Sequence, residues 1–368
     1  GWGAKDVTDD LIRIAEHLGA PVATTLQGLG VFPGDHPLHA GFSFGPSAVP
    51  SSQNAFGNCD VMLAVGTRFA EICTGSYGAV PPEKLIHIDI NPDSIGANHK
   101  TLIGICADSR DAVPALADAL AELPARSGEA VASQIGKDKA AYRDEWLEHD
   151  SKGRVNPCRF FAELRAQLAD DAIVISDDGN HTFLTAELMP IHRGGQFLSP
   201  TDFNCMGYCV PATIAVKMAM PERQVVGIVG DGAFLMTGLE SVTAAANNIG
   251  AIWFVFNDGE LAQIAQAQEM PYQRTACTNV GKLNYEAFAS ATGVEYVEIR
   301  TDEDLAEGVT GALQKSSEGR PVLVNVHVDY SKKTQFTVGT VQTNLKRFDT
   351  RNKLRIVGRA LKRKLFGS

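Results

Sequence analysis

Two short apolar runs frame a glycine turn in the second half of the chain. The run 223–229, Arg-Gln-Val-Val-Gly-Ile-Val, is rich in β-branched residues and stops at Gly230-Asp231-Gly232, as a buried parallel strand does. The run 251–256 has the same character and delivers Asn257, 26 positions after Asp231. Open α/β sheets bind ligands at the carboxyl ends of their strands, so these two polar residues are expected at one edge of a parallel sheet.

The segment after the turn predicts a helix and an anion site. Apolar residues recur at helical spacing from Ala233 to Asn248. The N–H groups that follow Gly232 therefore open a helix and can bind anionic oxygens. A carboxylate, an amide oxygen and a main-chain carbonyl suit Mg²⁺ completed by two diphosphate oxygens. The expected metal ligands are Asp231, Asn257 and Gly259. The residues expected to bind the cofactor that carries this diphosphate are Gly230, Asp231, Gly232, Ala233, Phe234, Asn257, Gly259, Glu260 and Leu261.

Three motifs occur in the order of a known family. A lone Gly-Asp-Gly is usually only a turn after a strand. The whole pattern resembles the thiamine diphosphate signature of the acetolactate synthase, pyruvate oxidase and benzoylformate decarboxylase superfamily. In that pattern a strand is followed by Gly-Asp-Gly, a helix, a second strand and an asparagine. The loop 176–181, Ser-Asp-Asp-Gly-Asn-His, resembles its D-V-G-Q-H loop, and the segment 205–212 resembles its T-M-G-F-G-L-P-A loop.

The resemblance assigns roles to residues that would not stand out alone. It implies that Asn180 and His181 contact the diphosphate and that Met206 lies under the bend of the cofactor. Outside the matched pattern, His181 would more often be an ordinary loop histidine and Met206 ordinary core.

The resemblance also implies a reaction class. The cofactor supplies the nucleophile, so no serine or cysteine triad is required. We expect decarboxylation of a small 2-oxo acid followed by carboligation, as in an acetolactate synthase catalytic subunit. A 2-oxo acid decarboxylase, a pyruvate oxidase-like enzyme and a non-catalytic subunit are the alternatives. Acetolactate synthases read N-N-x-x-L-G-M-V-R-Q-W-Q after the metal loop, whereas Ala265 and Ala267 stand here in place of Arg and Trp, so the acceptor is left open.

The first 110 residues resemble the central domain of the same superfamily. The matching stretches are 21–38, Val65-Gly66-Thr67-Arg68-Phe69 and 86–92. Acetolactate synthases hold FAD in this domain, so the resemblance offers Gly3, Arg68 and Asp89 as FAD contacts, the acid by accepting from a ribose hydroxyl. Residues 43–46 replace the M-H-G stretch that lies against the flavin, and many relatives keep this domain without a nucleotide. FAD binding is therefore left open.

Members of this superfamily have three α/β domains, and the first carries the glutamate that activates the cofactor. Since the chain begins at Gly1 inside the expected second domain, we expect a fragment or a first domain encoded elsewhere. No residue is assigned as the activating glutamate, and Glu240 is expected to make a structural contact. The family's cofactor lies between two subunits, which predicts a homodimer or homotetramer.

The predicted fold is α/β, with two three-layer αβα domains that contain parallel sheets. A Rossmann-like domain is expected over residues 1–125, a partly helical linker over 126–155, the thiamine diphosphate-binding domain over 156–335 and a basic tail over 336–368. Seven scattered cysteines without a C-x-x-C pair predict reduced thiols and a cytoplasmic location. No apolar run reaches the length of a membrane span.

Charge is unevenly distributed along the chain. The net charge is −10, yet residues 346–364 hold nine Lys and Arg against Asp349 alone. Apolar residues at helical spacing in this tail predict an amphipathic helix: Leu354, Val357, Leu361 and Leu365. Packing on the acidic body or on a neighbouring subunit is favoured over an anionic membrane surface, since one short helix binds bilayers weakly. Nucleic-acid binding is not expected, because the tail has few aromatic residues for base stacking.

Overall fold

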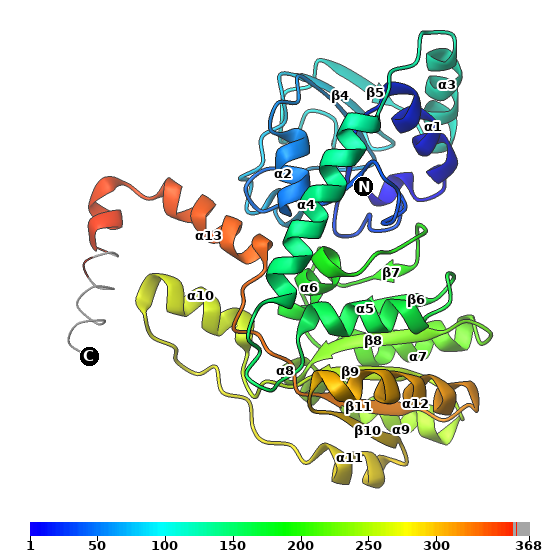
Figure 1. The fold of residues 1–368 in the computed structure, drawn as a ribbon, viewed down its shortest axis with the longest axis vertical. Helices are drawn as coiled ribbons and strands as arrows, with labels where there is room; N and C mark the ends of the chain where they lie inside the picture. The colour runs from blue at the N-terminus through cyan, green and yellow to red at the C-terminus, as the bar shows by residue number, and fades with distance from the viewer. Residues whose placement is uncertain (356–357, 359–368) are drawn as a thin grey trace. The chain divides into compact units, whose positions relative to one another are not determined.

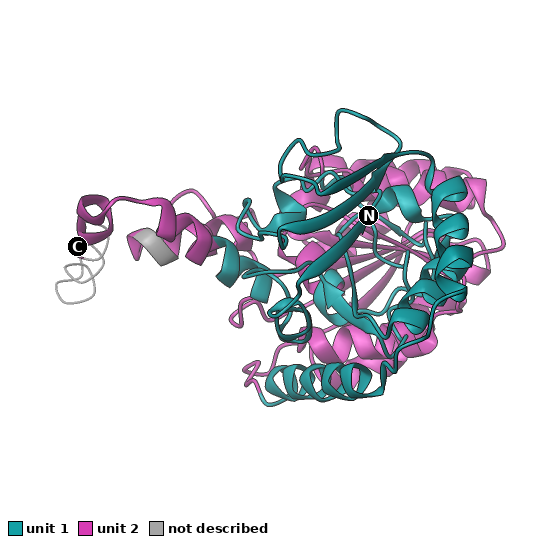
Figure 2. Ribbon diagram, turned by 90° about the horizontal axis from the view of Figure 1, so that it is seen from above, with its two compact units in different colours: residues 1–148, 186–201, 335–340 teal, residues 149–185, 202–334, 341–368 magenta. Residues whose placement is uncertain are grey.

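The computed structural model describes residues 1–355 and residue 358, with only the backbone at 270 and 271 (Figure 1). The chain forms two compact units. Unit 1 comprises residues 1–148, 186–201 and 335–340, and unit 2 comprises residues 149–185, 202–334 and 341–368 (Figure 2). Both units contain parallel sheets with connecting helices, so the predicted α/β class is confirmed.

Unit 1 contains two small parallel sheets. One has the order β3 (Val61–Val65), β4 (Lys84–Asp89) and β5 (Ile103–Cys106), and the other pairs β1 (Val22–Thr24) with β2 (His39–Phe42). Its further elements are η1 (Trp2–Ala4), α1 (Thr8–Leu18), α2 (Pro50–Phe56), η2 (Ile72–Thr74), α3 (Ser109–Ala121), α4 (Glu129–Leu147) and β7 (Phe197–Leu198). Helix α4 occupies most of the stretch 126–155 that the sequence predicts as a partly helical linker.

The sheet of unit 2 positions the candidate site. Its strands follow the order β10 (Glu295–Ile299), β11 (Val322–Val326), β9 (Ile252–Phe256), β8 (Val225–Gly230) and β6 (Ile173–Ser176), and every adjacent pair is parallel. Gly230 lies opposite Phe256 in the register of β8 and β9. The next residues, Asp231 and Asn257, therefore leave the sheet at the same edge, as the sequence predicts.

Helices pack on both sides of this sheet. Helices α5 (Pro157–Gln167) and α12 (Leu305–Ser317) contact each other, while α9 (Ser241–Ala246) contacts both α7 (Cys209–Ala219) and α11 (Tyr285–Thr292) (Figure 1). The remaining elements are α6 (Asn180–Leu188), α8 (Asp231–Thr237), η3 (Gly238–Glu240), α10 (Ala262–Tyr272), η4 (Asp302–Asp304) and α13 (Gln335–Arg347). Pro157 occupies the first turn of α5, where its missing N–H costs nothing.

The helix expected from Ala233 to Asn248 is interrupted. It consists of α8, the 3-10 turn η3 and α9. Thr237 leaves the helical conformation with φ −134° and ψ 5°, and its hydroxyl donates to the Gly207 carbonyl at 2.9 Å. The helix therefore breaks where a side chain bonds to a loop distant in sequence. Apolar periodicity cannot report such a bond.

The basic tail is only partly described. Leu354 is exposed, and the other apolar residues of the predicted amphipathic helix, Val357, Leu361 and Leu365, lie outside the described residues. Among the helices that are described, none combines the length and the apolar character needed to cross a membrane.

Candidate cofactor site

A cavity of about 130 Å³ lies at the carboxyl edge of the sheet in unit 2. The loops after β6, β8 and β9 contribute to its lining. The structure brings together nine of the residues predicted from the sequence: Asn180, His181, Met206, Gly230, Asp231, Gly232, Ala233, Glu260 and Leu261. Three predicted residues, Phe234, Asn257 and Gly259, do not line it, whereas Asp258 and Tyr330 do.

Asp231 is held rigidly at the start of α8. It is buried, and its two carboxylate oxygens accept from the main-chain N–H groups of Gly232 and Gly259, each at 2.7 Å. Burial raises the pKa of this carboxyl, while the N–H donors act in the opposite direction. The bond to Gly259 joins the loop after β8 to the loop after β9.

Asp258 is the residue that sequence reasoning missed. Burial and, secondarily, the charge of Asp231 raise the pKa of the Asp258 carboxyl to about 7. Asp231 and Asp258 thus share one partly buried pocket, which Asp178 and Glu260 also line, and a divalent cation relieves such a gathering of acidic groups. The only sequence signal was that Asp258 directly follows the predicted ligand Asn257.

The two predicted metal ligands beside Asp258 make other contacts. The Asn257 amide donates to the Asn325 side chain at 3.0 Å, and the Asn257 main-chain carbonyl accepts from Arg154 at 2.6 Å. The Gly259 carbonyl accepts from the Val280 N–H at 3.0 Å. Metal ligation by Asn257 and Gly259 remains a prediction, since the contacts of Asn257 use its amide nitrogen and main-chain oxygen and do not involve its side-chain oxygen.

Two polar side-chain atoms without partners line the same cavity. The Oδ1 atom of Asn180 and the Nε2 atom of His181 are buried and have no hydrogen-bond partner among the described residues. Burial lowers the pKa of His181 to about 3, so its imidazole is neutral at physiological pH. Buried polar atoms left without partners are costly, so these two atoms fit a polar ligand such as a diphosphate.

Glycine is needed where the backbone approaches this histidine. Gly179 has φ +155°, and a Cβ atom added there would lie 2.6 Å from the His181 ring. A Cβ atom at Gly230 would lie 3.1 Å from the same ring. Gly179 therefore excludes a side chain unless the His181 ring shifts, and Gly230 leaves a tight fit against the same ring.

Asp177 connects the loop after β6 to the loop that carries Met206. Its side chain is fully buried and accepts from the N–H groups of Gly207 at 2.9 Å, Cys209 at 2.7 Å and Asp178 at 2.8 Å. Burial raises the pKa of this carboxyl, opposed by the same N–H donors. Asp177 thus fixes the loop that carries Met206 beside the cavity, a role that the sequence motif alone did not reveal.

In unit 1, the residues offered as FAD contacts lie in η1, after β3 and at the end of β4. The Gly3 N–H donates to the Gly66 carbonyl at 3.3 Å, and a Cβ atom at Gly3 would lie 2.9 Å from the Gly66 Cα atom. Asp89 ends β4, and its carboxylate accepts from the Asn91 N–H at 2.9 Å. Arg68 is exposed two residues after Gly66. FAD binding remains a prediction.

Comparison with known proteins agrees with this geometry. A family model described as "Thiamine pyrophosphate enzyme, central domain" matches residues 1–116, and one described as "Thiamine pyrophosphate enzyme, C-terminal TPP binding domain" matches residues 177–326. This chain belongs to the thiamine pyrophosphate enzymes. The resemblance stated from the sequence motifs is thereby confirmed, and the second model covers every residue of the 130 Å³ cavity except Tyr330.

Relatives of this thiamine pyrophosphate enzyme carry related names. A probable acetolactate synthase large subunit of Methanocaldococcus jannaschii is 30% identical over 88% of this chain and 55% of its own length. The acetolactate synthase large subunit of Corynebacterium glutamicum is 30% identical over 87% of this chain and 52% of its own length. A sulfoacetaldehyde acetyltransferase of Rhodobacter capsulatus is 29% identical over 87% of this chain and 58% of its own length. The chain spans little more than half the length of these relatives.

Proposed function

We propose that this thiamine pyrophosphate enzyme binds thiamine diphosphate with Mg²⁺ in the unit 2 cavity and serves an acetolactate synthase-like reaction. In that reaction, a small 2-oxo acid loses carbon dioxide and the remaining fragment is joined to an acceptor. The observation that carries the proposal is one cavity that joins two carboxylates, Asp231 and Asp258, to the unpartnered polar atoms of Asn180 and His181. The acetolactate synthase names of several relatives support it.

The proposed protein ligands for Mg²⁺ are Asp231, the Asn257 side-chain oxygen and the Gly259 main-chain carbonyl, with Asp258 beside them in the cavity lining. Mg²⁺ prefers oxygen ligands and usually takes only a few from the protein, with substrate or cofactor phosphates completing its coordination. Among the described residues, no cluster of three or more His, Cys, Asp and Glu side chains is suited to a metal. A site with so few protein oxygen ligands therefore needs phosphate oxygens to complete it.

The surrounding residues bind and orient the cofactor. When bound, thiamine diphosphate supplies the nucleophilic carbon and the electron-accepting ring for 2-oxo acid chemistry. Neutral His181 and Asn180 contact the diphosphate without adding charge, and the first N–H groups of α8 face the same anion. Met206 packs under the cofactor from a loop that Asp177 holds in place.

The decisive test replaces the first metal ligand. Asp231→Ala should weaken Mg²⁺-dependent binding of thiamine diphosphate by 100-fold or more, on the order of 3 kcal/mol, because a charged metal ligand is lost. Isothermal titration calorimetry measures this affinity. Glu240→Ala is the matched control, since Glu240 is an exposed acid in η3 outside the cavity lining. Unchanged affinity in a folded Asp231→Ala variant would refute the site.

The reaction itself needs a second assay. Pyruvate is the donor, and a mixture with an amino-terminal α/β domain of a relative supplies the expected activating glutamate. Acetolactate is the expected product, and the mixture should turn over about 10²–10⁴-fold faster than this chain alone. Acetaldehyde release or flavin reduction would instead support the decarboxylase or oxidase alternative. Full turnover by the chain alone would contradict the expected need for that domain.

A further inference from the structure

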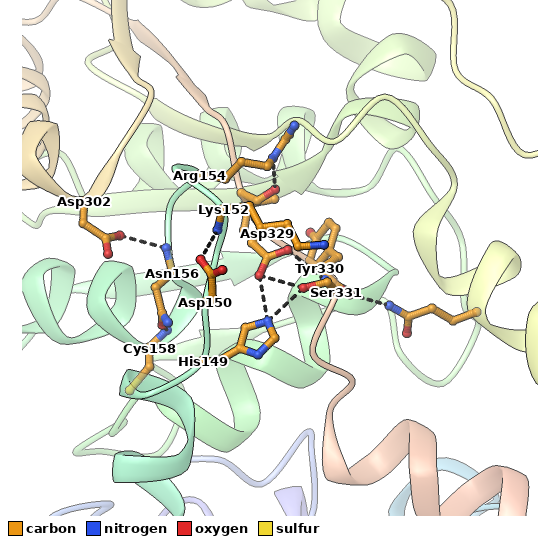
Figure 3. A network of polar contacts seen from close by, with 12 residues as sticks. His149, Asp150, Lys152, Arg154, Asn156, Cys158, Asp302, Asp329, Tyr330 and Ser331 are labelled. Carbon is orange, nitrogen blue, oxygen red and sulfur yellow. Dashed lines mark hydrogen bonds and ion pairs between the residues drawn. The ribbon is translucent and has the colours of Figure 1, made fainter.

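Arg154 lies beside the metal loop but belongs to none of the motifs. It lines a second cavity, of about 380 Å³, together with Asp258, Glu260, Tyr330 and Lys333. Asp258, Glu260 and Tyr330 also line the 130 Å³ cavity, so the two are neighbours in unit 2. Figure 3 shows Arg154 next to the turn formed by Asp329, Tyr330 and Ser331.

The Arg154 guanidinium joins the ends of two strands. Its Nε atom donates to the Val328 carbonyl at 2.9 Å, and its Nη2 atom donates to the Asn257 carbonyl at 2.6 Å. Val328 follows β11 and Asn257 follows β9, and these strands are parallel neighbours. Because the peptide that begins at the Asn257 carbonyl leads directly into Asp258, this bond restricts where the Asp258 carboxylate can point.

The backbone beside Arg154 is fixed as well. The Val155 N–H donates to the His327 carbonyl at 2.9 Å, and the Asp329 N–H donates to the Val155 carbonyl at 3.0 Å. This short parallel pairing anchors Arg154 to the end of β11. Because the main chain next to Arg154 is held in this way, its side chain extends from a fixed position to the residue that follows β9.

The charge of Arg154 is not used in a local ion pair. No carboxylate lies within ion-pair distance of Arg154 among the described residues, whereas Lys333 pairs with Glu269 at 3.8 Å and His149 with Asp329 at 3.1 Å. Burial raises the pKa values of Asp231 and Asp258, and the Arg154 charge acts on both in the opposite direction. Arg154 therefore bonds to main-chain carbonyls next to Asp258 and, among the described residues, to neither carboxylate of the pair.

We propose that Arg154 is a positioning residue of the cofactor site, which fixes the strand-end peptide between Asn257 and Asp258 and thereby holds the metal loop in place. The inference rests on the proposed function of the unit 2 cavity. Lysine keeps the charge but cannot form the planar fork to two carbonyls, so Arg154→Lys separates position from charge.

The first measurement uses a metal readout without catalysis. Mn²⁺ prefers the same oxygen ligands as Mg²⁺, and electron paramagnetic resonance of free Mn²⁺ gives its affinity in the presence of thiamine diphosphate. Arg154→Lys should bind Mn²⁺ 10- to 100-fold more weakly, the usual cost of losing a residue that orients a metal ligand. Guanidinium ion at millimolar concentration should restore part of the affinity of Arg154→Ala, whereas equal sodium chloride should not.

Controls and a ligand-free measurement complete the test. Arg159→Lys is the matched control, since Arg159 is exposed on α5 and pairs with Asp302 at 3.2 Å. In the ligand-free chain, amides of residues 257–261 should exchange at least 10-fold faster in Arg154→Lys than in the parent. Mn²⁺ affinity and amide exchange within two-fold of the parent would overturn the inference. A parent chain that binds no Mn²⁺ would refute the proposed function, and the exchange measurement would still decide the role of Arg154.

Discussion

At the scale of single residues, the pair Asp231 and Asp258 is costly until a cation binds. The pKa of Asp258 is raised from 3.8 to about 7, chiefly by burial and next by Asp231. A group whose folded-state pKa is raised contributes stability that is complete below its unfolded pKa and is lost as the pH rises through the folded value. The metal-free protein should therefore lose stability between about pH 4 and pH 7.

Asp258→Asn should remove this pH dependence. We expect the free energy of unfolding of the parent to fall by roughly 2 kcal/mol between pH 4.5 and pH 8 from this site, less than the full shift implies because the residue is partly exposed. Urea unfolding in a chelator measures the fall, which should be absent in the variant. Asp171→Asn is the control, since Asp171 forms an exposed ion pair with Arg223. An identical pH profile in parent and variant would contradict the proposed repulsion.

At the scale of elements, the first turn of α13 depends on one carboxylate of unit 1. Glu187 accepts from the N–H groups of Phe336 at 2.8 Å and Gln335 at 3.1 Å, and from the Tyr142 hydroxyl at 2.5 Å. The first N–H groups of a helix have no partner within the helix, so Glu187 satisfies two of them. Burial raises the pKa of this carboxyl to about 7 despite the three donors.

Glu187→Ala should loosen the start of α13. Loss of the three hydrogen bonds to the buried Glu187 carboxylate should lower the free energy of unfolding of unit 1 by about 2–4 kcal/mol. Hydrogen exchange of residues 335–340 should accelerate more than that of other helices. Glu122→Ala serves as the control, because Glu122 is exposed just after α3. Equal protection of 335–340 in both variants would show that α13 is held by other contacts.

At the scale of the whole molecule, apolar side chains remain exposed beside the cofactor cavity. They lie on α8, η3 and α9: Leu235, Met236, Leu239 and Val242. Leu239 is the most exposed of them, at 72%. Exposed apolar patches often mark interaction surfaces, which agrees with the predicted homodimer or homotetramer.

Leu239→Glu should weaken self-association at this surface. A buried carboxylate without a partner is costly, so the dimer dissociation constant should rise at least 10-fold. Sedimentation velocity across a range of concentrations measures the change. Leu102→Glu is the control on unit 1, where Leu102 is 62% exposed. A parent chain that stays monomeric, or a variant that associates as the parent does, would rule out this surface.

Local sequence determined the elements and the family. The β-branched runs at 223–229 and 251–256 form β8 and β9 because such runs fit a buried parallel strand, and their register brings the glycine turn and Asn257 to one edge. The motifs at 176–181, 205–212 and 230–232 identify a thiamine pyrophosphate enzyme because their order along the chain is that of the family. These features depend on neighbours in sequence, so the sequence reports them directly.

Only the tertiary structure decided which side chains meet in the cavity. Asn257 and Asp258 are adjacent polar residues, and the direction each faces depends on Asn325 and Arg154, which lie 68 and 103 positions from Asn257. The break after α8 depends on a bond from Thr237 to Gly207, 30 positions away. Arg154 itself reaches Val328 across 174 positions. Such contacts exist only after the strands are assembled, so local periodicity carries no record of them.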